Sequence, residues 1–129
     1  MARSKPPKPT DAELSILRVL WSRGPSTVRQ VQQELNKVRP TGYTTALKFL
    51  QIMTEKRLVS RDESNRTHIY RPRLPRERTQ RQLVKDVLDK AFGGATAELV
   101  SQALMSGKTS AEDLEEIRTL LDELEGGSR

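Results

Sequence analysis

The chain contains no cysteine and a single histidine among its 129 residues. Disulfides, thiolate metal sites and cysteine catalysis are therefore excluded, and one histidine does not make an ordinary zinc cluster. Hydrophobic residues make up 34% of the chain and aromatic residues 4%, which allows only a modest core. No spacing of Ser, Thr, His and acidic residues forms a catalytic constellation. We predict that the chain is not an enzyme and carries neither a cofactor nor a metal.

Long hydrophobic runs are missing as well. No stretch approaches the roughly 18 apolar residues that a membrane span needs. Residues 1–9 hold three basic residues and three prolines, with no apolar region behind them. We therefore expect a cytoplasmic protein without membrane contact, in which residues 1–9 form a flexible basic arm.

The net charge of +6 is divided unevenly along the chain. Residues 1–78 contain 17 Lys and Arg against 7 Asp and Glu, whereas residues 79–129 contain 6 against 10. A basic block suits the phosphate backbone, which dominates the affinity of proteins for nucleic acids. The acidic block indicates another role for the second part. A basic solvated surface without a partner is the alternative.

Helical periodicity begins at Thr10, which together with Glu13 forms a capping-box pattern. An apolar stripe follows at helical spacing and stops at Gly24; its residues are Leu14, Ile16, Leu17, Leu20 and Trp21. Trp21 is interpreted as a core residue rather than a ligand-stacking one.

Two further helices are predicted on either side of the short connection 37–40. Thr27 and Gln30 repeat the capping pattern, and the third helix is expected to open at Thr41 and to span 41–56. Its apolar residues are Ala46, Leu47, Leu50 and Met53; its opposite face carries Thr41, Thr44, Thr45, Lys48, Gln51, Ile52 and Glu55. Short hydroxyl side chains and a lysine on the first turns are typical of a recognition helix in the major groove. An ordinary solvated helix face is the alternative.

Two short extended runs, 58–61 and 68–71, flank the polar segment 62–67 and predict a β-hairpin, or wing. Basic side chains on the wing suit contacts with the DNA backbone or the minor groove. His68 alone also suits a proton switch or a catalytic base, but we favour a partly exposed strand residue. Residues 10–74 are thus predicted to form a winged-helix DNA-binding domain, whose DNA-binding residues are Thr41, Tyr43, Thr44, Thr45, Lys48, Arg39, Arg61, Arg66 and His68.

Residues 75–125 read as three short amphipathic helices separated by glycines, followed by a tail at 126–129. Their apolar stripes are too long to be buried by three short helices, so we predict a homodimer. The dimerisation residues are Leu83, Val84, Val87, Leu88, Leu99, Val100, Leu104, Leu114, Ile117, Leu121 and Leu124. The acidic run 112–116 occupies the first turns of a helix, where the helix dipole favours carboxylates, and is not interpreted as a metal site.

The order of these parts resembles the penicillinase-repressor and methicillin-resistance-repressor family, over about residues 9–124. The segments that carry the resemblance are 10–17 with Leu20 and Trp21, 44–50, 68–72, and Leu99 and Val100 leading to 110–114. It implies a mainly α fold, a winged helix-turn-helix followed by a C-terminal helical dimerisation region. It also implies a dimeric transcriptional repressor that occupies a palindromic operator in double-stranded DNA.

Some of the family's features are replaced in this chain. In penicillin-responsive members an upstream sensor system triggers proteolysis at an Asn-Phe bond, and the aligned residues here are Gln102 and Ala103. Copper-responsive relatives use a cysteine-rich motif, which is absent. Ile52 and Met53 replace an Arg-Leu pair, and Arg57 replaces a glycine. A winged-helix adaptor that binds proteins instead of an operator is the alternative function.

Overall fold

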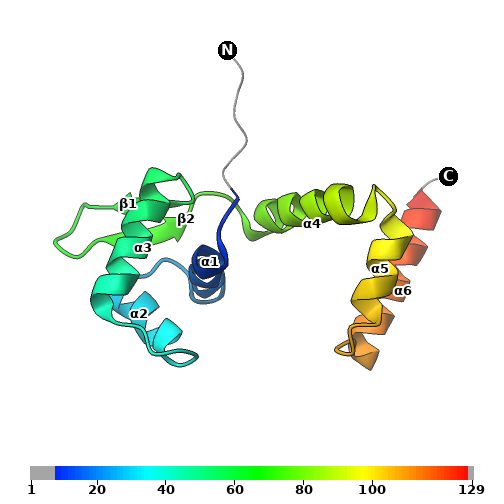
Figure 1. Cartoon of the computed structure of the whole chain (residues 1–129), viewed down its shortest axis with the longest axis horizontal. Coiled ribbons are helices and arrows are strands. Elements are labelled where there is room, and N and C mark those ends of the chain that lie inside the picture. Colours follow the sequence, from blue (N-terminus) through cyan, green and yellow to red (C-terminus); the bar gives the residue numbers. More distant parts are fainter. Residues whose placement is uncertain (1–7, 128–129) are drawn as a thin grey trace, which may run out of the picture. The chain divides into compact units, whose positions relative to one another are not determined.

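The computed structural model describes residues 8–127, which form two compact units divided between Leu83 and Val84 (Figure 1). The first unit contains α1 (Asp11–Arg23), α2 (Val28–Asn36), α3 (Tyr43–Glu55), β1 (Val59–Asp62) and β2 (Ile69–Pro72). The division falls within α4 (Arg76–Phe92), and α5 (Thr96–Leu104) and α6 (Ala111–Gly127) complete the second unit. This mainly helical structure with one hairpin confirms the predicted fold class.

The predicted arm and tail lie largely outside this description. Residues 1–7 and 128–129 are not among the described residues, whereas Pro9, which we assigned to the arm, is buried. No helix within residues 8–127 has both the length and the apolar character needed to cross a membrane.

Both predicted capping boxes are present. The backbone N–H of Glu13 donates to Thr10 Oγ1 at 3.2 Å, and the N–H of Thr10 donates to Glu13 Oε1 at 2.9 Å. At the start of α2, Gln30 N–H donates to Thr27 Oγ1 at 3.1 Å and Thr27 N–H donates to Gln30 Oε1 at 2.9 Å. Each box satisfies N–H groups that would otherwise lack partners, and so fixes where α1 and α2 begin.

The predicted start of the third helix at Thr41 is wrong. α3 begins at Tyr43, and Gly42 occupies the N-cap position with an extended backbone. The N–H of Thr41 donates to Asn36 Oδ1 at 2.9 Å, and its carbonyl oxygen accepts from Gln32 Nε2 at 2.9 Å. Because side chains of α2 already satisfy the backbone of Thr41, this residue belongs to the turn rather than to the helix.

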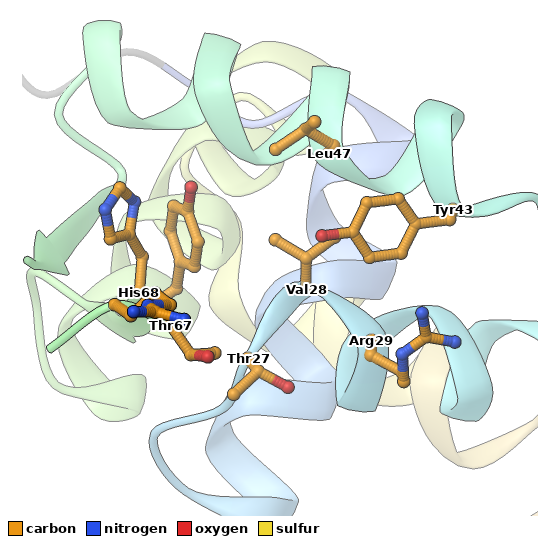
Figure 2. Close-up of a pocket in the computed structure, with 9 residues that line it drawn as sticks. Thr27, Val28, Arg29, Tyr43, Leu47, Thr67 and His68 are labelled. Carbon is orange, nitrogen blue, oxygen red and sulfur yellow. The ribbon is translucent and has the colours of Figure 1, made fainter.

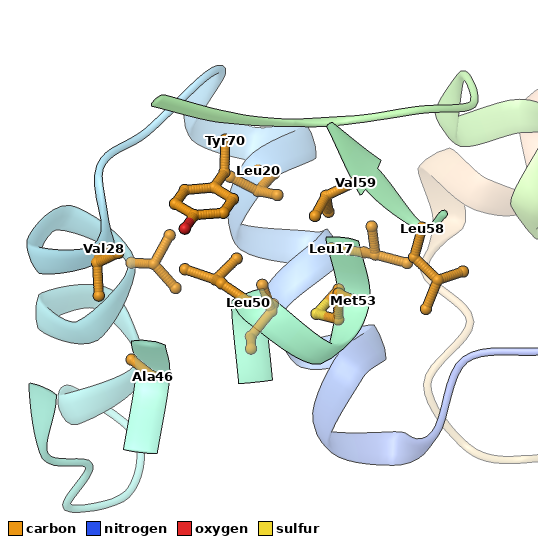
Figure 3. Packing of buried hydrophobic residues seen from close by; sticks show 11 residues of the cluster. Leu17, Leu20, Val28, Ala46, Leu50, Met53, Leu58, Val59 and Tyr70 are labelled. Carbon is orange, nitrogen blue, oxygen red and sulfur yellow. The ribbon is translucent and has the colours of Figure 1, made fainter. Parts of the chain in front are cut away.

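A single core fills the first unit between α1, α2, α3 and the hairpin (Figure 3). Its buried hydrophobic residues are Ile16, Leu17, Leu20, Val28, Val31, Ala46, Leu50, Met53, Leu58, Val59 and Tyr70. Trp21, which was interpreted as a core residue, is half-buried and packs against the edge of this cluster. The core therefore fixes which side of α3 faces outward.

The hairpin is antiparallel, with Val59 opposite Pro72 and Asp62 opposite Ile69, one residue later on each strand than predicted. A bridge that we did not predict joins it to the α1–α2 connection. Ser26 N–H donates to the Tyr70 carbonyl at 3.0 Å, and Tyr70 N–H donates to the Ser26 carbonyl at 2.8 Å. The base of the wing is thus tied to the residue just before the α2 cap.

α3 ends in a Schellman motif. Leu58 N–H donates to the Met53 carbonyl at 2.9 Å, and Arg57 N–H donates to the Thr54 carbonyl at 3.1 Å. Arg57 has φ of 65°, a left-handed conformation that favours glycine. The position at which the sequence departs from the family's glycine is therefore one where a side chain costs conformational energy.

The second unit has no buried core of its own. None of residues 80–126 is buried. The last helix begins with a side-chain cap, because Asp113 N–H donates to Ser110 Oγ at 3.0 Å. The helices of this unit are well formed, but the described residues of the unit do not bury their apolar faces.

Candidate nucleic-acid interface

The outer face of α3 is an exposed, mainly polar surface. Its residues Thr44, Thr45, Lys48, Gln51, Ile52 and Glu55 are all exposed, as the helical periodicity predicted. Ala46, Leu50 and Met53 point the other way and have 0% of their surface exposed. No acidic residue lies in the first turn of α3, so its N-terminal half is compatible with a polyanion.

Two predicted site residues lie in the turn before α3 and not on its outer face. Arg39 is exposed, and its carbonyl oxygen accepts a hydrogen bond from the Thr41 hydroxyl at 2.8 Å. Thr41 is half-buried. Its hydroxyl group donates a hydrogen bond within the turn that leads into α3.

Arg61 is committed to contacts within the wing. Its guanidinium lies 2.7 Å from Glu63 Oε2, and the hydrogen bond to Tyr70 and then that to Glu63 raise its pKa further above the usual value. At the start of the wing tip, Asp62 Oδ1 accepts from the backbone N–H and the hydroxyl of Ser64, at 2.9 and 2.7 Å. These bonds order one side of the tip, while Arg66 at the tip is exposed.

An open cleft of about 460 Å³ lies between the beginning of α2, the beginning of α3 and the wing (Figure 2). It is lined by Thr27, Val28, Arg29, Tyr43, Leu47, Arg66, Thr67, His68 and Tyr70. The guanidinium carbon of Arg29 lies 5.4 Å from the centre of the Tyr43 ring, in cation–π geometry. Three of the predicted site residues, Tyr43, Arg66 and His68, therefore meet in one cleft.

Arg29 and Thr27 are lining residues that the sequence analysis missed as candidate site residues. Thr27 was interpreted only as a cap, and no role was predicted for Arg29. The periodicity of α2 places Arg29 outside the stripe of Val28 and Val31, but only the packing of α2 on α3 places it over Tyr43.

The predicted dimerisation residues divide into two groups by exposure. Leu83, Leu88, Leu99, Leu104 and Ile117 are half-buried, and Val84, Val87, Val100, Leu114, Leu121 and Leu124 are exposed. On α6 the apolar residues fall within an arc of roughly 120° at about 100° per residue. Leu124 on this arc is 63% exposed, which leaves an uncovered apolar stripe.

No group of His, Asp and Glu side chains within residues 8–127 is placed to hold a metal ion. The acidic run 112–116 lies on the first turns of α6, with all its side chains exposed.

The sequence model of the penicillinase repressor family matches residues 9–123. The chain belongs to the penicillinase repressor family. It is 35% identical over 120 residues to the transcriptional regulator BlaI of Mycobacterium tuberculosis, covering 91% of this chain and 85% of that relative. It is 23% identical to the penicillinase repressor of Bacillus licheniformis, covering 92% and 93%. Members of this family are transcriptional repressors and not enzymes, in agreement with the prediction from the sequence.

Solved structures of repressors from this family share the fold. A solution structure of the monomeric form of Bacillus licheniformis BlaI in complex with the blaP half-operator superimposes with a TM-score of 0.50 and 25% identity. The match covers 57% of this chain and 89% of that one. The DNA-binding domain of the repressor BlaI superimposes with the same TM-score of 0.50 at 24% identity.

Proposed function

We propose that this chain is a DNA-binding transcriptional repressor that occupies a palindromic operator as a homodimer, one winged helix in each half-site. The observation that carries the proposal is the outward, acid-free first half of α3 above a fully buried core face. Family membership and the half-operator complex of a relative support it. Repression by occupancy needs no chemistry beyond tight, selective binding.

The outer face of α3 supplies the side chains for the major groove. Thr44 and Thr45 are short enough for close approach and carry hydroxyls that donate and accept hydrogen bonds. Lys48, one turn further on, supplies the positive charge. Ile52 offers an apolar surface that suits a thymine methyl group. Because the family's Arg-Leu pair is absent at Ile52 and Met53, the preferred operator differs from that of relatives which keep the pair.

Homodimerisation through α4, α5 and α6 is supported by the uncovered apolar stripes of the second unit. An identical set of helices offers the simplest complementary surface. Pairing two winged helices also raises the affinity for two half-sites far above that for one, because the second contact becomes intramolecular.

We also propose that the signal that releases this repressor from its operator differs from the signal used by the penicillin-responsive relatives. Gln102 and Ala103, in place of the Asn-Phe bond, are exposed on α5. A sensor-triggered protease that requires that bond has no matching substrate sequence here.

The first test is selection of DNA fragments from a random pool at stated salt, followed by titration of the selected duplex. We expect an inverted repeat with half-sites one helical turn apart, or a multiple of it. Lys48→Ala is expected to weaken binding about 10-fold or more, because it removes a charged contact from each half-site. Sequencing of the selected fragments shows the repeat, and fluorescence anisotropy measures the affinity of the unchanged chain and of the variant.

Lys108→Ala is the matched control, because it removes the same charge from an exposed residue of the second unit. Its affinity should equal that of the unchanged chain. If no sequence is enriched and binding to duplex DNA has no steep salt dependence, the adaptor function is favoured instead. If operator affinity is unchanged in Lys48→Ala, Lys48 does not belong to the site.

A further inference from the structure

The cleft between α2, α3 and the wing is strongly one-sided in charge. None of its nine lining residues carries a carboxylate, while Arg29 comes from α2 and Arg66 comes from the wing. Neither arginine forms an ion pair with any Asp or Glu in the part of the chain that the structure describes. Two arginines from different elements thus line one opening without a counter-charge.

Arg29 is held in place before any ligand arrives. Its guanidinium lies over the ring of Tyr43, which is itself 44% exposed at the start of α3. A cation fixed over an aromatic face loses less conformational freedom on binding than a free side chain. The guanidinium group also presents several N–H donors to an oxyanion.

The cleft adjoins the outer face of α3. Tyr43 and Leu47 line it, and Thr44, the next residue after Tyr43, stands on the exposed face. A group held in the cleft therefore lies beside the helix edge that carries the proposed base contacts. Thr27 and Thr67, which also line it, add hydroxyl groups that can donate to an oxyanion.

From this geometry, and given the proposed function, we infer that the cleft binds one phosphate of the DNA backbone next to each half-site, with Arg29 and Arg66 as its cations. Such a contact contributes affinity and orientation but carries no base information. Arg29 is thereby a positioning residue, which sets how α3 enters the groove.

The test measures binding of the full chain to the selected operator and to an unrelated duplex over a range of KCl concentrations. Arg29→Gln should weaken both duplexes by the same factor, about 10-fold, at fixed salt. The slope of log affinity against log salt should fall by about 0.9 for each chain bound, because one phosphate contact per chain is lost. The order of preference among sequences should not change.

Arg18→Gln is the matched control, since Arg18 is exposed on α1, which contributes nothing to the cleft. The fluorescence of Trp21 reports whether either variant alters folding. If Arg29→Gln behaves like Arg18→Gln in affinity and slope, the inference is overturned. A loss of affinity for only one of the two duplexes, with an unchanged salt slope, also overturns the inference, because such a loss indicates a contact with a base.

A second pair of variants tests the role of the ring. Tyr43→Leu should weaken both duplexes several-fold, whereas Tyr43→Phe, which keeps the aromatic face under Arg29, should bind both duplexes more tightly than Tyr43→Leu does. Equal binding by the two variants would contradict the positioning role of the ring.

Inorganic phosphate distinguishes a backbone phosphate from a free anion. Titrated into the full chain at constant ionic strength and followed by calorimetry, it should give no saturable binding in the low millimolar range. Saturable binding that Arg29→Gln abolishes, with DNA affinity unchanged, would make the cleft a free-anion site instead. Failure of the unchanged chain to bind any duplex would contradict the proposed function itself.

Discussion

The two units of this chain stabilise themselves in different ways. The unit that ends at Leu83 closes eleven buried hydrophobic residues into one core, from Ile16 to Tyr70. The unit that begins at Val84 buries none of its residues up to 126 and exposes Val84, Leu120 and Leu124 by 50, 53 and 63%. The first unit has the interior of a stable small domain, and the second has helices whose apolar sides need another surface.

Because of this difference, we expect the stability of the second unit, but not that of the first, to depend on protein concentration. A self-contained core gives the first unit a stability that is independent of association, whereas a unit completed by a second copy gains stability by mass action. Trp21, the only tryptophan, is half-buried in the first unit and reports its unfolding alone. The contrast can therefore be tested one unit at a time.

The largest expected effect comes from Leu121→Asp, which places a charge in the exposed apolar stripe of α6. The variant should sediment as a monomer, and its operator affinity should fall about 100-fold, because the two half-sites are no longer bound by linked units. Sedimentation equilibrium and anisotropy titration measure the two effects. The Trp21 unfolding midpoint should not move.

Thr119→Asp is its control, because Thr119 is exposed on the other side of α6. It should leave dimer and affinity intact. A stable dimer of Leu121→Asp would place the interface elsewhere and break the division between the units.

The next effect concerns an ion pair inside the first unit. Glu13, 3% exposed, accepts from Lys56 Nζ at 2.7 and 3.0 Å and so joins the start of α1 to the end of α3. Burial alone would raise the pKa of Glu13, but the bonds from Lys56 and Thr10 outweigh it and hold the pKa below its ordinary value. Lys56→Met should therefore cost about 2 kcal/mol at pH 7, because it leaves a buried carboxylate unpaired.

The stabilisation that the Glu13–Lys56 ion pair gives should decrease as the pH falls. Because the folded-state pKa of Glu13 is lowered, its contribution is complete above the ordinary value of 4.5 and is lost as the pH falls through the folded-state pKa. The difference between Lys56→Met and the unchanged chain should shrink in that acid range, as followed by urea unfolding of Trp21. Lys37→Met, which breaks the exposed pair with Glu34, should have almost no effect at any pH.

The smallest effect is a gain in stability. Arg57→Gly removes a side chain from a residue with φ of 65° and should raise the free energy of unfolding of the first unit by about 0.5–1 kcal/mol. Gly24→Ala, at φ of 97°, should have the opposite sign. A destabilised Arg57→Gly would mean that the side chain makes a contact worth more than the strain.

Local patterns in the sequence predicted the elements and the faces of this fold. Thr10 with Glu13 and Thr27 with Gln30 marked two helix starts, since a capping box depends only on residues three positions apart. The spacing of Ala46, Leu50 and Met53 identified the buried side of α3, and with it the exposed position of Lys48. The helix start predicted at Thr41 was wrong because a threonine before a helix suits either a cap or a turn. Hydrogen bonds from side chains of α2 to the backbone of Thr41 place it in the turn.

Contacts between distant residues could not be predicted in the same way. The pairing of Glu13 with Lys56 spans 43 positions. The stacking of Arg29 on Tyr43 and the bridge between Ser26 and Tyr70 likewise depend on how the helices and the hairpin pack. The candidate cleft is built from such contacts, and for that reason the sequence indicated some of its residues but not the cleft itself.

The bridge between Ser26 and Tyr70 has a consequence for how the wing can evolve. Two backbone hydrogen bonds from outside the hairpin fix the register of β2, since a slip by one residue would turn the buried Tyr70 out of the core. The alignment of the strands thus does not depend on the turn that joins them. Residues 63–65, which do not line the cleft, can change in length and composition without shifting β2, and a new DNA contour can be matched at the tip while the cleft and the interior stay the same.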